Sequence, residues 1–450
     1  MFYDLYTPEG EALTGTPWPV YPRPQMRRDS FLNLNGTWDF TVRKTGELPD
    51  AYDRTILVPF CPESLLSGVH EHFAEGSYLF YRRRVALPEG FVRGPLLLHI
   101  GAADQVLDCY ADGRHIGTHT GGYEAMTFEL SCAPRAEFEL VLRVRDDLRS
   151  TVLPYGKQVM QRGGMWYTPV SGIWQTVWME SVPEHAVRAL DIQADCETAV
   201  IDTRDETLTG TVTVETSGGA LTVPLERGKA EVRPPEPRLW SPESPHLYRF
   251  VLETQTDRVE SYFALRDVGV GRDAAGHPCL TLNGRPVFHT GVLDQGYWPD
   301  GLYTAPSDEA LVWDIRTMKS LGFNMLRKHI KVEPMRWYYH CDRLGMLVWQ
   351  DMPNGGGKYD LLAISAPLIT RRHKKDNDYK RFARTDAAGR AEYYAGLDEM
   401  VRQLYNCPSI VMWVPFNEGW GQFDAAEAVR RIRALDQTRT IDHASGWYDQ

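Results

Sequence analysis

The sequence predicts a multidomain protein in which two β-rich segments precede an α/β domain. Its 450 residues exceed the ~250–300 at which a single hydrophobic core stops growing. Short apolar runs between Gly, Pro, Asn and Asp turns fill residues 1–272, a pattern typical of sandwiches and jelly rolls. From about residue 285, strand-like and helix-like segments alternate, as they do in parallel sheets and barrels.

The two β-rich segments are expected at residues 1–183 and 184–272. In the first, turn signals such as Asp112-Gly113 separate strands expected at 36–40, 77–81, 96–100, 105–110 and 138–144. The second has a polar, Thr- and Gly-rich middle, and its expected role is that of a spacer and buttress.

The α/β domain is expected to occupy residues 273–450. Ser307 caps a helix that Gly322 ends. Pro334 opens a second helix that Gly345 ends, and Asp424 with Glu427 gives a capping-box-like start to a later one. Strands are expected at 287–293, 324–329, 346–351 and 409–416, and a fifth begins at 440. A long polar stretch, 354–388, contains the basic run 371–375 and is either a solvated loop or a segment that covers substrate.

Composition limits the classes of partner. The net charge of -11 argues against nucleic acid or an anionic membrane. No stretch approaches the ~18 apolar residues of a membrane span, and the N-terminus lacks the pattern of a secretory signal. The seven cysteines are scattered without a C-x-x-C pair, which indicates free thiols in a cytoplasmic protein and excludes a cysteine-rich zinc module.

Other enzyme classes are set aside on their motifs. The spacing Gly269-x-Gly271-x-x-Ala274 fits a dinucleotide-binding loop, but a hairpin-like segment follows it where that loop needs a helix. Neither the G-x-S-x-G of an esterase nor an H-E-x-x-H metal motif occurs. The histidines at 70, 72, 115 and 119 lack further ligands, so neither a metal nor a cofactor is expected.

The ends of the expected parallel strands carry the candidate site. An almost uninterrupted apolar run from Ser409 ends in Asn417-Glu418, as expected of a strand buried on both faces. Because the C-terminal ends of barrel strands converge on one face, the polar residues that close these strands are expected to share a pocket suited to sugar recognition. These residues are Asp294, Arg327, His329, Asp351, Asn417, Glu418 and Trp447. A buried ion pair between Arg327 and Asp351 that only braces the sheet is an equal alternative.

Several sequence motifs, taken together in their order and spacing, resemble those of glycoside hydrolase family 2. Residues 34–40 (LNGTWDF) and 166–178 (WYTPVSGIWQTVW) are similar to its sugar-binding jelly roll. Residues 237–248 (PRLWSPESPHLY) resemble its immunoglobulin-like middle domain. The resemblance spans essentially the whole chain and implies a jelly roll at 1–183, an immunoglobulin-like sandwich at 184–272 and the N-terminal part of a TIM barrel at 273–450.

The resemblance also implies roles for the strand-end residues. Glu418 corresponds to the general acid/base, and Asn417 to the amide that hydrogen-bonds the sugar 2-hydroxyl. Arg327 and His329 resemble an Asn-x-x-Arg-x-x-His pattern, with one residue fewer between Arg and His, and Asp351 stands at a family acidic position. The segment around Asp294 departs from the common galactosidase and glucuronidase pattern, so the resemblance leaves open which sugar the protein recognises.

The sequence is therefore interpreted as a retaining exo-β-glycosidase of β-galactosides or β-glucuronides that works through a covalent glycosyl-enzyme. The alternative is a non-catalytic carbohydrate-binding protein on the same scaffold, and a homo-oligomer stays open. The resemblance places the nucleophilic Glu beyond residue 450, so the sequence is expected to be C-terminally incomplete and residues 1–450 alone inactive. The jelly roll, with Trp38, Trp174 and Trp178 as core anchors, is expected to support the site without forming it.

Overall fold

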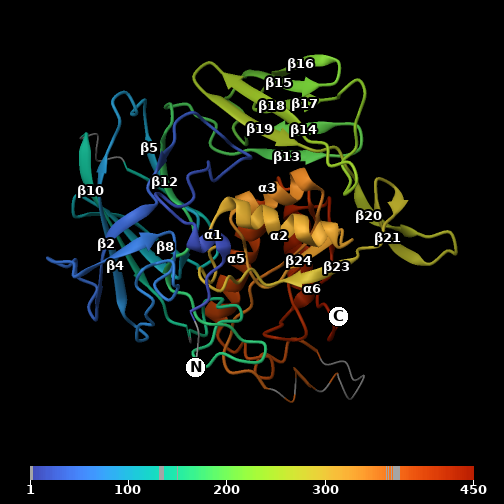
Figure 1. The fold of residues 1–450 in the computed structure, drawn as a ribbon. Helices are drawn as coiled ribbons and strands as arrows, with labels where there is room; N and C mark the ends of the chain where they lie inside the picture. The colour runs from blue at the N-terminus through green and yellow to red at the C-terminus, as the bar shows by residue number, and fades with distance from the viewer. Residues whose placement is uncertain are drawn as a thin grey trace.

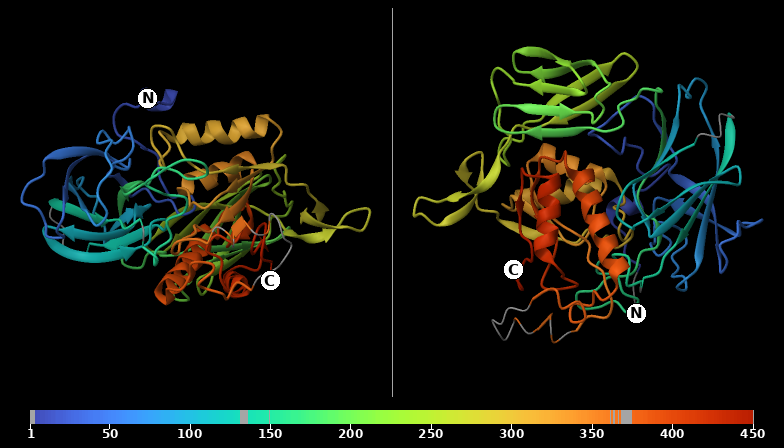
Figure 2. Two further views of the ribbon diagram at one scale, coloured as in Figure 1. Left: turned by 90° about the horizontal axis from the view of Figure 1, so that it is seen from below. Right: turned by 180° about the vertical axis from the view of Figure 1, so that it is seen from behind.

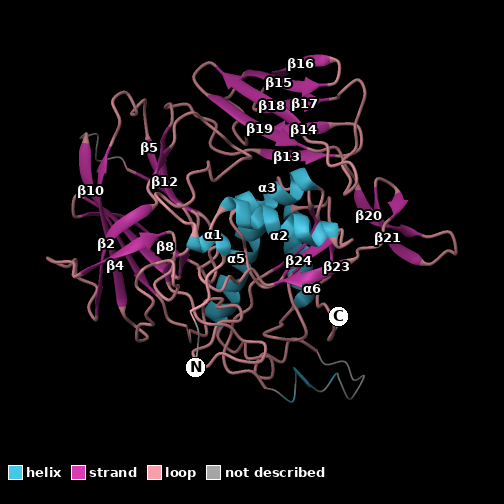
Figure 3. Ribbon diagram, in the orientation of Figure 1, coloured by secondary structure: helices cyan, strands magenta, loops and turns pink. Residues whose placement is uncertain are grey.

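The computed structural model describes residues 4–130, 136–148, 150–360, 362, 364–365, 367 and 375–449. Two all-β domains and one α/β domain follow one another along the chain, coloured blue to cyan, green, and yellow to red in Figure 1. Figure 3 shows that nearly all helical residues lie in the α/β domain. None of the helices in the described part of the chain is long and apolar enough to cross a membrane.

The first domain is a sandwich of two antiparallel sheets, with strand orders β1-β12-β5-β9 and β3-β2-β4-β10-β7-β8. Side chains that alternate along the strands meet between the sheets, and Trp38, predicted as a core anchor, is 1% exposed there. The bounds are α1 (Pro8–Glu11), β1 (Leu32–Asn33), β2 (Gly36–Arg43), β3 (Arg54–Val58), β4 (Tyr78–Ala86), β5 (Leu96–Ile100), β6 (Ala103–Asp104), β7 (Val106–Ala111), β8 (Arg114–Thr120), β9 (Met126–Glu129), β10 (Glu137–Arg145), β11 (Gly172–Ile173) and β12 (Val177–Ser181).

The second domain also packs two antiparallel sheets around one core, with strand orders β13-β14-β17 and β16-β15-β18-β19. Its strands are β13 (Asp191–Ala194), β14 (Ala199–Asp202), β15 (Gly210–Thr216), β16 (Gly219–Leu225), β17 (Lys229–Val232), β18 (Tyr248–Thr254) and β19 (Arg258–Phe263).

A small separate sheet of β20 (Val268–Arg272), β21 (Pro278–Leu282) and β22 (Arg285–Pro286) follows the second domain. It projects from the molecule in both views of Figure 2. The glycine-spaced segment from Gly269 lies on this hairpin, and the element that follows it is the strand β21 instead of a helix.

The α/β domain is built on one parallel sheet whose strands lie side by side in chain order. The strands are β23 (Gly291–Asp294), β24 (Met325–Lys328), β25 (Leu347–Asp351), β26 (Ile410–Val414) and β27 (Thr440–Ile441), and the helices are α2 (Asp308–Ser320), α3 (Met335–Leu344), α5 (Ala387–Leu404) and α6 (Ala425–Leu435). The first strand begins later than predicted, because the Val287 N–H donates to the Leu280 carbonyl at 3.0 Å and stays with the preceding hairpin.

The helix ends follow the predicted chemistry with one exception. The Ser307 hydroxyl accepts the Ala310 N–H, and Gly345 ends α3 with φ 73°. The capping box predicted at Asp424 is wrong, because this residue has φ 40° and makes no side-chain cap hydrogen bond. The N–H of Ala425 donates instead to Asp376 Oδ2 at 2.7 Å. A residue 49 positions earlier therefore satisfies this helix start.

One hydrophobic core extends from the first domain into the α/β domain. Trp174, expected inside the sandwich, packs across this boundary with its ring centroid 5.0 Å from that of Tyr303. Its Nε1 donates to the Gly122 carbonyl at 2.9 Å, and the Thr304 hydroxyl donates to the Trp174 carbonyl at 2.6 Å. The first domain and the α/β domain therefore share buried apolar surface that neither domain can cover alone.

Candidate active site

Arg327 connects three neighbouring strand ends. Its guanidinium donates to Asp351 Oδ1 at 2.8 Å, to Asn417 Oδ1 at 2.9 Å and to the Ser445 hydroxyl at 2.8 Å. These partners follow or end β25, β26 and β27. Because the guanidinium is a planar fork of donors, its bonds fix the orientation of an acid, an amide and a hydroxyl at once. Ser445 was not predicted; only its place just beyond the fifth strand could have indicated it.

His329 joins the same network through Asp351. Its Nδ1 lies 2.6 Å from Asp351 Oδ2, and the two side chains are 4% and 1% exposed. Both carboxylate oxygens of Asp351 are thus taken, one by Arg327 and one by His329. The buried ion pair considered from the sequence is present, and it lies within the cluster of predicted site residues.

Glu418 lies directly after Asn417 on a constrained turn. Its φ of 50° is in the left-handed region, which costs a residue with a side chain about 1 kcal/mol or more. The turn is held by the Glu418 N–H, which donates to the Ser445 carbonyl at 3.1 Å, and by the Trp420 N–H, which donates to the Asn417 carbonyl at 3.0 Å. Among the described residues no donor is placed on the half-buried Glu418 carboxylate, which leaves its oxygens open to a ligand.

Asp294 lies apart from this cluster. Its Oδ1 is 2.8 Å from the ammonium of Lys328, which lies over the Trp337 ring of α3 on the helix-facing side of the sheet. Side chains alternate along a strand, and Asp294 pairs in register with Lys328, so it faces away from Arg327. It lines a separate cavity of about 350 Å³.

Trp447 lies two residues after Ser445, close in sequence to the cluster. Its Nε1 is buried and has no hydrogen-bond partner among the described residues. The first four residues of the predicted basic run, 371–374, lie outside the described part of the chain.

A loop of the first domain, residues 154–167, borders the strand ends. The N–H groups of Tyr155 and Gly156 both donate to the Asn354 carbonyl, at 3.0 and 2.9 Å, beyond the end of β25. Trp166 meets Trp420 edge to face at 5.5 Å, two residues beyond Glu418. These contacts bring a loop of the first domain to the border of the strand ends, and the expectation that this domain supports the site without forming it stays a prediction. The run of glycine and aromatic residues at 163–167 is the sequence signal that could have indicated this contact.

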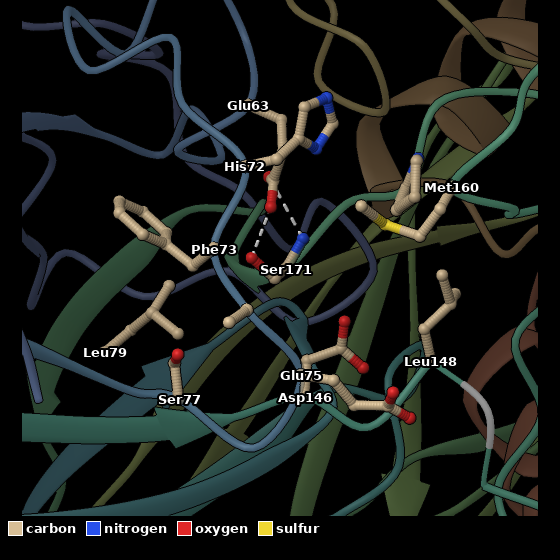
Figure 4. A pocket seen from close by; sticks show the side chains of 12 residues that line it. Glu63, His72, Phe73, Glu75, Ser77, Leu79, Asp146, Leu148, Met160 and Ser171 are labelled. Carbon is tan, nitrogen blue, oxygen red and sulfur yellow. Dashed lines mark hydrogen bonds between the residues drawn. The ribbon is translucent and has the colours of Figure 1, made fainter. Parts of the chain in front are cut away.

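A second cavity, of about 250 Å³, lies in the first domain, and Met160 of the same loop lines it (Figure 4). Glu63 lines it and accepts hydrogen bonds from the backbone N–H of Ser171, at 3.1 Å, and from the Ser171 hydroxyl. Burial raises the pKa of Glu63 to about 7, against the two hydrogen bonds from Ser171, which lower it. None of the predicted site residues lines this cavity, so the strand ends remain the candidate active site.

Family models match the second and third parts of the chain. Residues 277–450 match the TIM barrel domain of glycosyl hydrolases family 2, and residues 184–266 match a second model of glycosyl hydrolases family 2. A β-galactosidase of Thermoanaerobacter pseudethanolicus is 22% identical over 92% of this chain, and a putative β-glucuronidase of Formosa agariphila is 29% identical over 48%. These matches cover 55% and 19% of the two relatives, so the chain spans about half the length of the first.

Solved structures share the fold. A β-glucuronidase from an uncultured Clostridium species has a TM-score of 0.73 at 18% identity, over 94% of this chain and 74% of its own. A β-galacturonidase from Eisenbergiella tayi has a TM-score of 0.67 at 19% identity, over 94% of this chain and 72% of its own. The solved structures share the fold, and the matches to both family models show that the chain belongs to glycoside hydrolase family 2.

Proposed function

We propose that the protein is a retaining exo-β-glycosidase acting on β-galactosides or β-glucuronides. The observation that carries this proposal is the Glu418 carboxylate, open to a ligand beside an amide that Arg327 holds in place. In such enzymes one carboxyl group protonates the departing glycosidic oxygen while a second attacks the sugar carbon. The first then takes a proton from the water that releases the covalent intermediate. Glu418 is assigned the first role.

The network around Glu418 supports roles for its neighbours. Asn417 Oδ1 accepts from Arg327, so its amide NH₂ is free to donate to a sugar hydroxyl, which we assign as the 2-hydroxyl. His329 uses Nδ1 on Asp351, which leaves Nε2 for a second hydroxyl. Trp447 is assigned to contact the sugar, either by stacking on a ring face or by a hydrogen bond to a hydroxyl. The first and second domains are assigned as a jelly roll and an immunoglobulin-like sandwich.

The second carboxyl group is not assigned within residues 1–450. It has to lie ~5–5.5 Å from the first, and the oxygens of Asp351 are already paired with Arg327 and His329. Hydrolysis of any β-glycoside by the purified polypeptide of residues 1–450 would show that its nucleophile lies within them.

The test is a panel of aryl β-glycosides given to the intact gene product. We expect hydrolysis of β-galactosides or β-glucuronides, with the first-formed sugar keeping the β configuration by NMR. An inverted product contradicts the retaining mechanism. Sugar binding without hydrolysis favours the alternative, a carbohydrate-binding protein on the same scaffold.

A further inference from the structure

A buried arginine contacts the turn that carries the Glu418 carboxylate. Arg384 precedes α5 and is 1% exposed, and its Nε donates to the Gly421 carbonyl at 2.8 Å. Gly421 lies three residues after Glu418, and the two residues are left-handed, with φ of 62° and 50°. Because a side chain makes the left-handed conformation unfavourable, Glu418 keeps it only if contacts from the surroundings hold the turn. The bond from Arg384 is one of these contacts.

The backbone of Gly421 packs closely against two groups. A Cβ on Gly421 would lie 3.1 Å from Arg384 Nε and 2.5 Å from the Gly355 carbonyl oxygen, so a side chain has no room there. Gly355 follows Asn354, whose carbonyl accepts the N–H groups of the first-domain loop. Arg384 is itself fixed, since its own N–H donates to the Tyr379 carbonyl at 2.7 Å. The turn therefore has little freedom to shift while the guanidinium is in place.

Stability alone does not account for a guanidinium at position 384. Its central carbon lies 4.9 Å from the ring centroid of Tyr393 and 5.2 Å from that of Phe423, contacts that suit a planar cation. Its Nη1 and Nη2 atoms, however, are buried and have no hydrogen-bond partner among the described residues. Unpaired buried donors of a charged group are unfavourable, and apolar side chains of similar volume often replace buried ionic groups without loss of stability. What an apolar side chain would lack here is the bond to the turn.

Tyr393 of α5 holds the chain on the other side of Glu418. Its hydroxyl donates to the Pro415 carbonyl, and its ring stacks on that of Phe416 with centroids 5.0 Å apart and an interplanar angle of 8°. Pro415 and Phe416 follow β26 and lead directly into the turn. Arg384 and Tyr393 thus contact each other and fix the backbone on both sides of Glu418.

We infer that Arg384, together with Tyr393, is a positioning residue for Glu418. This inference rests on the proposed function and goes beyond it, because neither side chain touches the substrate. A general acid has to lie within hydrogen-bond reach of the oxygen that it protonates, and a misplacement of about 1 Å can cost about 10²-fold in rate. Loss of either contact should therefore impair proton transfer from Glu418 more than it impairs the other parts of the reaction.

The experiment measures, in the intact gene product, the ratio of kcat/KM for a p-nitrophenyl β-glycoside to that for the methyl β-glycoside of the same sugar. The activated aryl group departs with little help from an acid, whereas methoxide needs it. A variant that only folds less well loses active protein for both substrates and leaves the ratio unchanged. Arg384→Met should raise the ratio about 10-fold or more. Arg384→Lys, which keeps one donor for the Gly421 carbonyl, and Tyr393→Phe should raise it less.

The control and the opposing outcomes separate this inference from the proposed function. Tyr262→Phe removes a buried hydroxyl that donates to Asp342 Oδ2 at 2.6 Å, between the second domain and α3, and should leave the ratio unchanged. An unchanged ratio in Arg384→Met, or in Arg384→Lys and Tyr393→Phe where Arg384→Met does not fold, would overturn the positioning role while hydrolysis itself upholds the glycosidase. An equal rise in Tyr262→Phe would also overturn it. If the unsubstituted protein hydrolyses neither substrate, the proposed function fails and the inference fails with it.

Discussion

Replacing Glu63 by Gln should change how the stability of the protein depends on pH. Glu63 is 6% exposed, and its pKa rises from 4.5 to about 7 on folding because burial disfavours the carboxylate. Between these values the folded state binds more protons than the unfolded state, so the free energy of unfolding falls as pH rises from 4.5 to 7. At about 1.36 kcal/mol per unit, the ionised group costs the folded protein about 3 kcal/mol above pH 7.

The Gln side chain can keep both contacts with Ser171 and carries no titrating proton. The difference in unfolding free energy between Glu63→Gln and the unsubstituted protein should therefore grow in favour of the variant by about 3 kcal/mol between pH 4 and pH 8.5. Urea unfolding followed by tryptophan fluorescence at both pH values measures it. Glu89→Gln, which removes an exposed carboxylate from a turn of the same domain, is the matched control. A Glu63→Gln difference that is equal at the two pH values would refute the reasoning.

Three further changes test other parts of the structure. Glu418→Gln in the intact gene product should slow the hydrolysis of glycosides with poor leaving groups by about 10²–10⁴-fold, and that of activated aryl glycosides far less. The reason is that general acid assistance matters least when the leaving group departs unaided. Equal losses on both classes of substrate would contradict the assignment of Glu418 as the acid/base. Gly156→Ala should lower Tm and weaken sugar binding, because the new Cβ lies 2.7 Å from the Tyr123 hydroxyl at a φ of 64°. Gly164→Ala, with φ 60° and open space, is its control, and equal effects would show that backbone strain alone is responsible. Trp174→Ala should cost about 3–5 kcal/mol in chemical denaturation and affect both domains in one transition; an unchanged Tm with weaker substrate binding would contradict its structural role.

Local chemistry made much of the α/β domain predictable. The Ser307 hydroxyl and Gly345 mark helix ends through hydrogen bonds and dihedral angles set within a few residues. The convergence of parallel strand ends was enough to bring Arg327, Asp351 and Asn417 together. These features need no knowledge of distant contacts, which is why one sequence suffices for them.

The remaining features depend on register or on contacts between distant segments. A shift of one residue reverses the face of every side chain in a strand, so the outward orientation of Asp294 could not be read from its position at a strand end. Asp376 caps a helix 49 residues away. The N–H groups of Tyr155 and Gly156 reach the Asn354 carbonyl from a different domain.

The core shared by the first domain and the barrel segment limits how this chain can be recombined with its relatives. A crossover at residue 183 or 184 respects the sequence boundary but separates Trp174 and Tyr123 from Tyr303, whose rings pack together. A chimera that takes its barrel from another family member therefore inherits mismatched halves of one packed surface. Recombinants that exchange both halves of this surface together should fold more often than those that exchange the barrel alone.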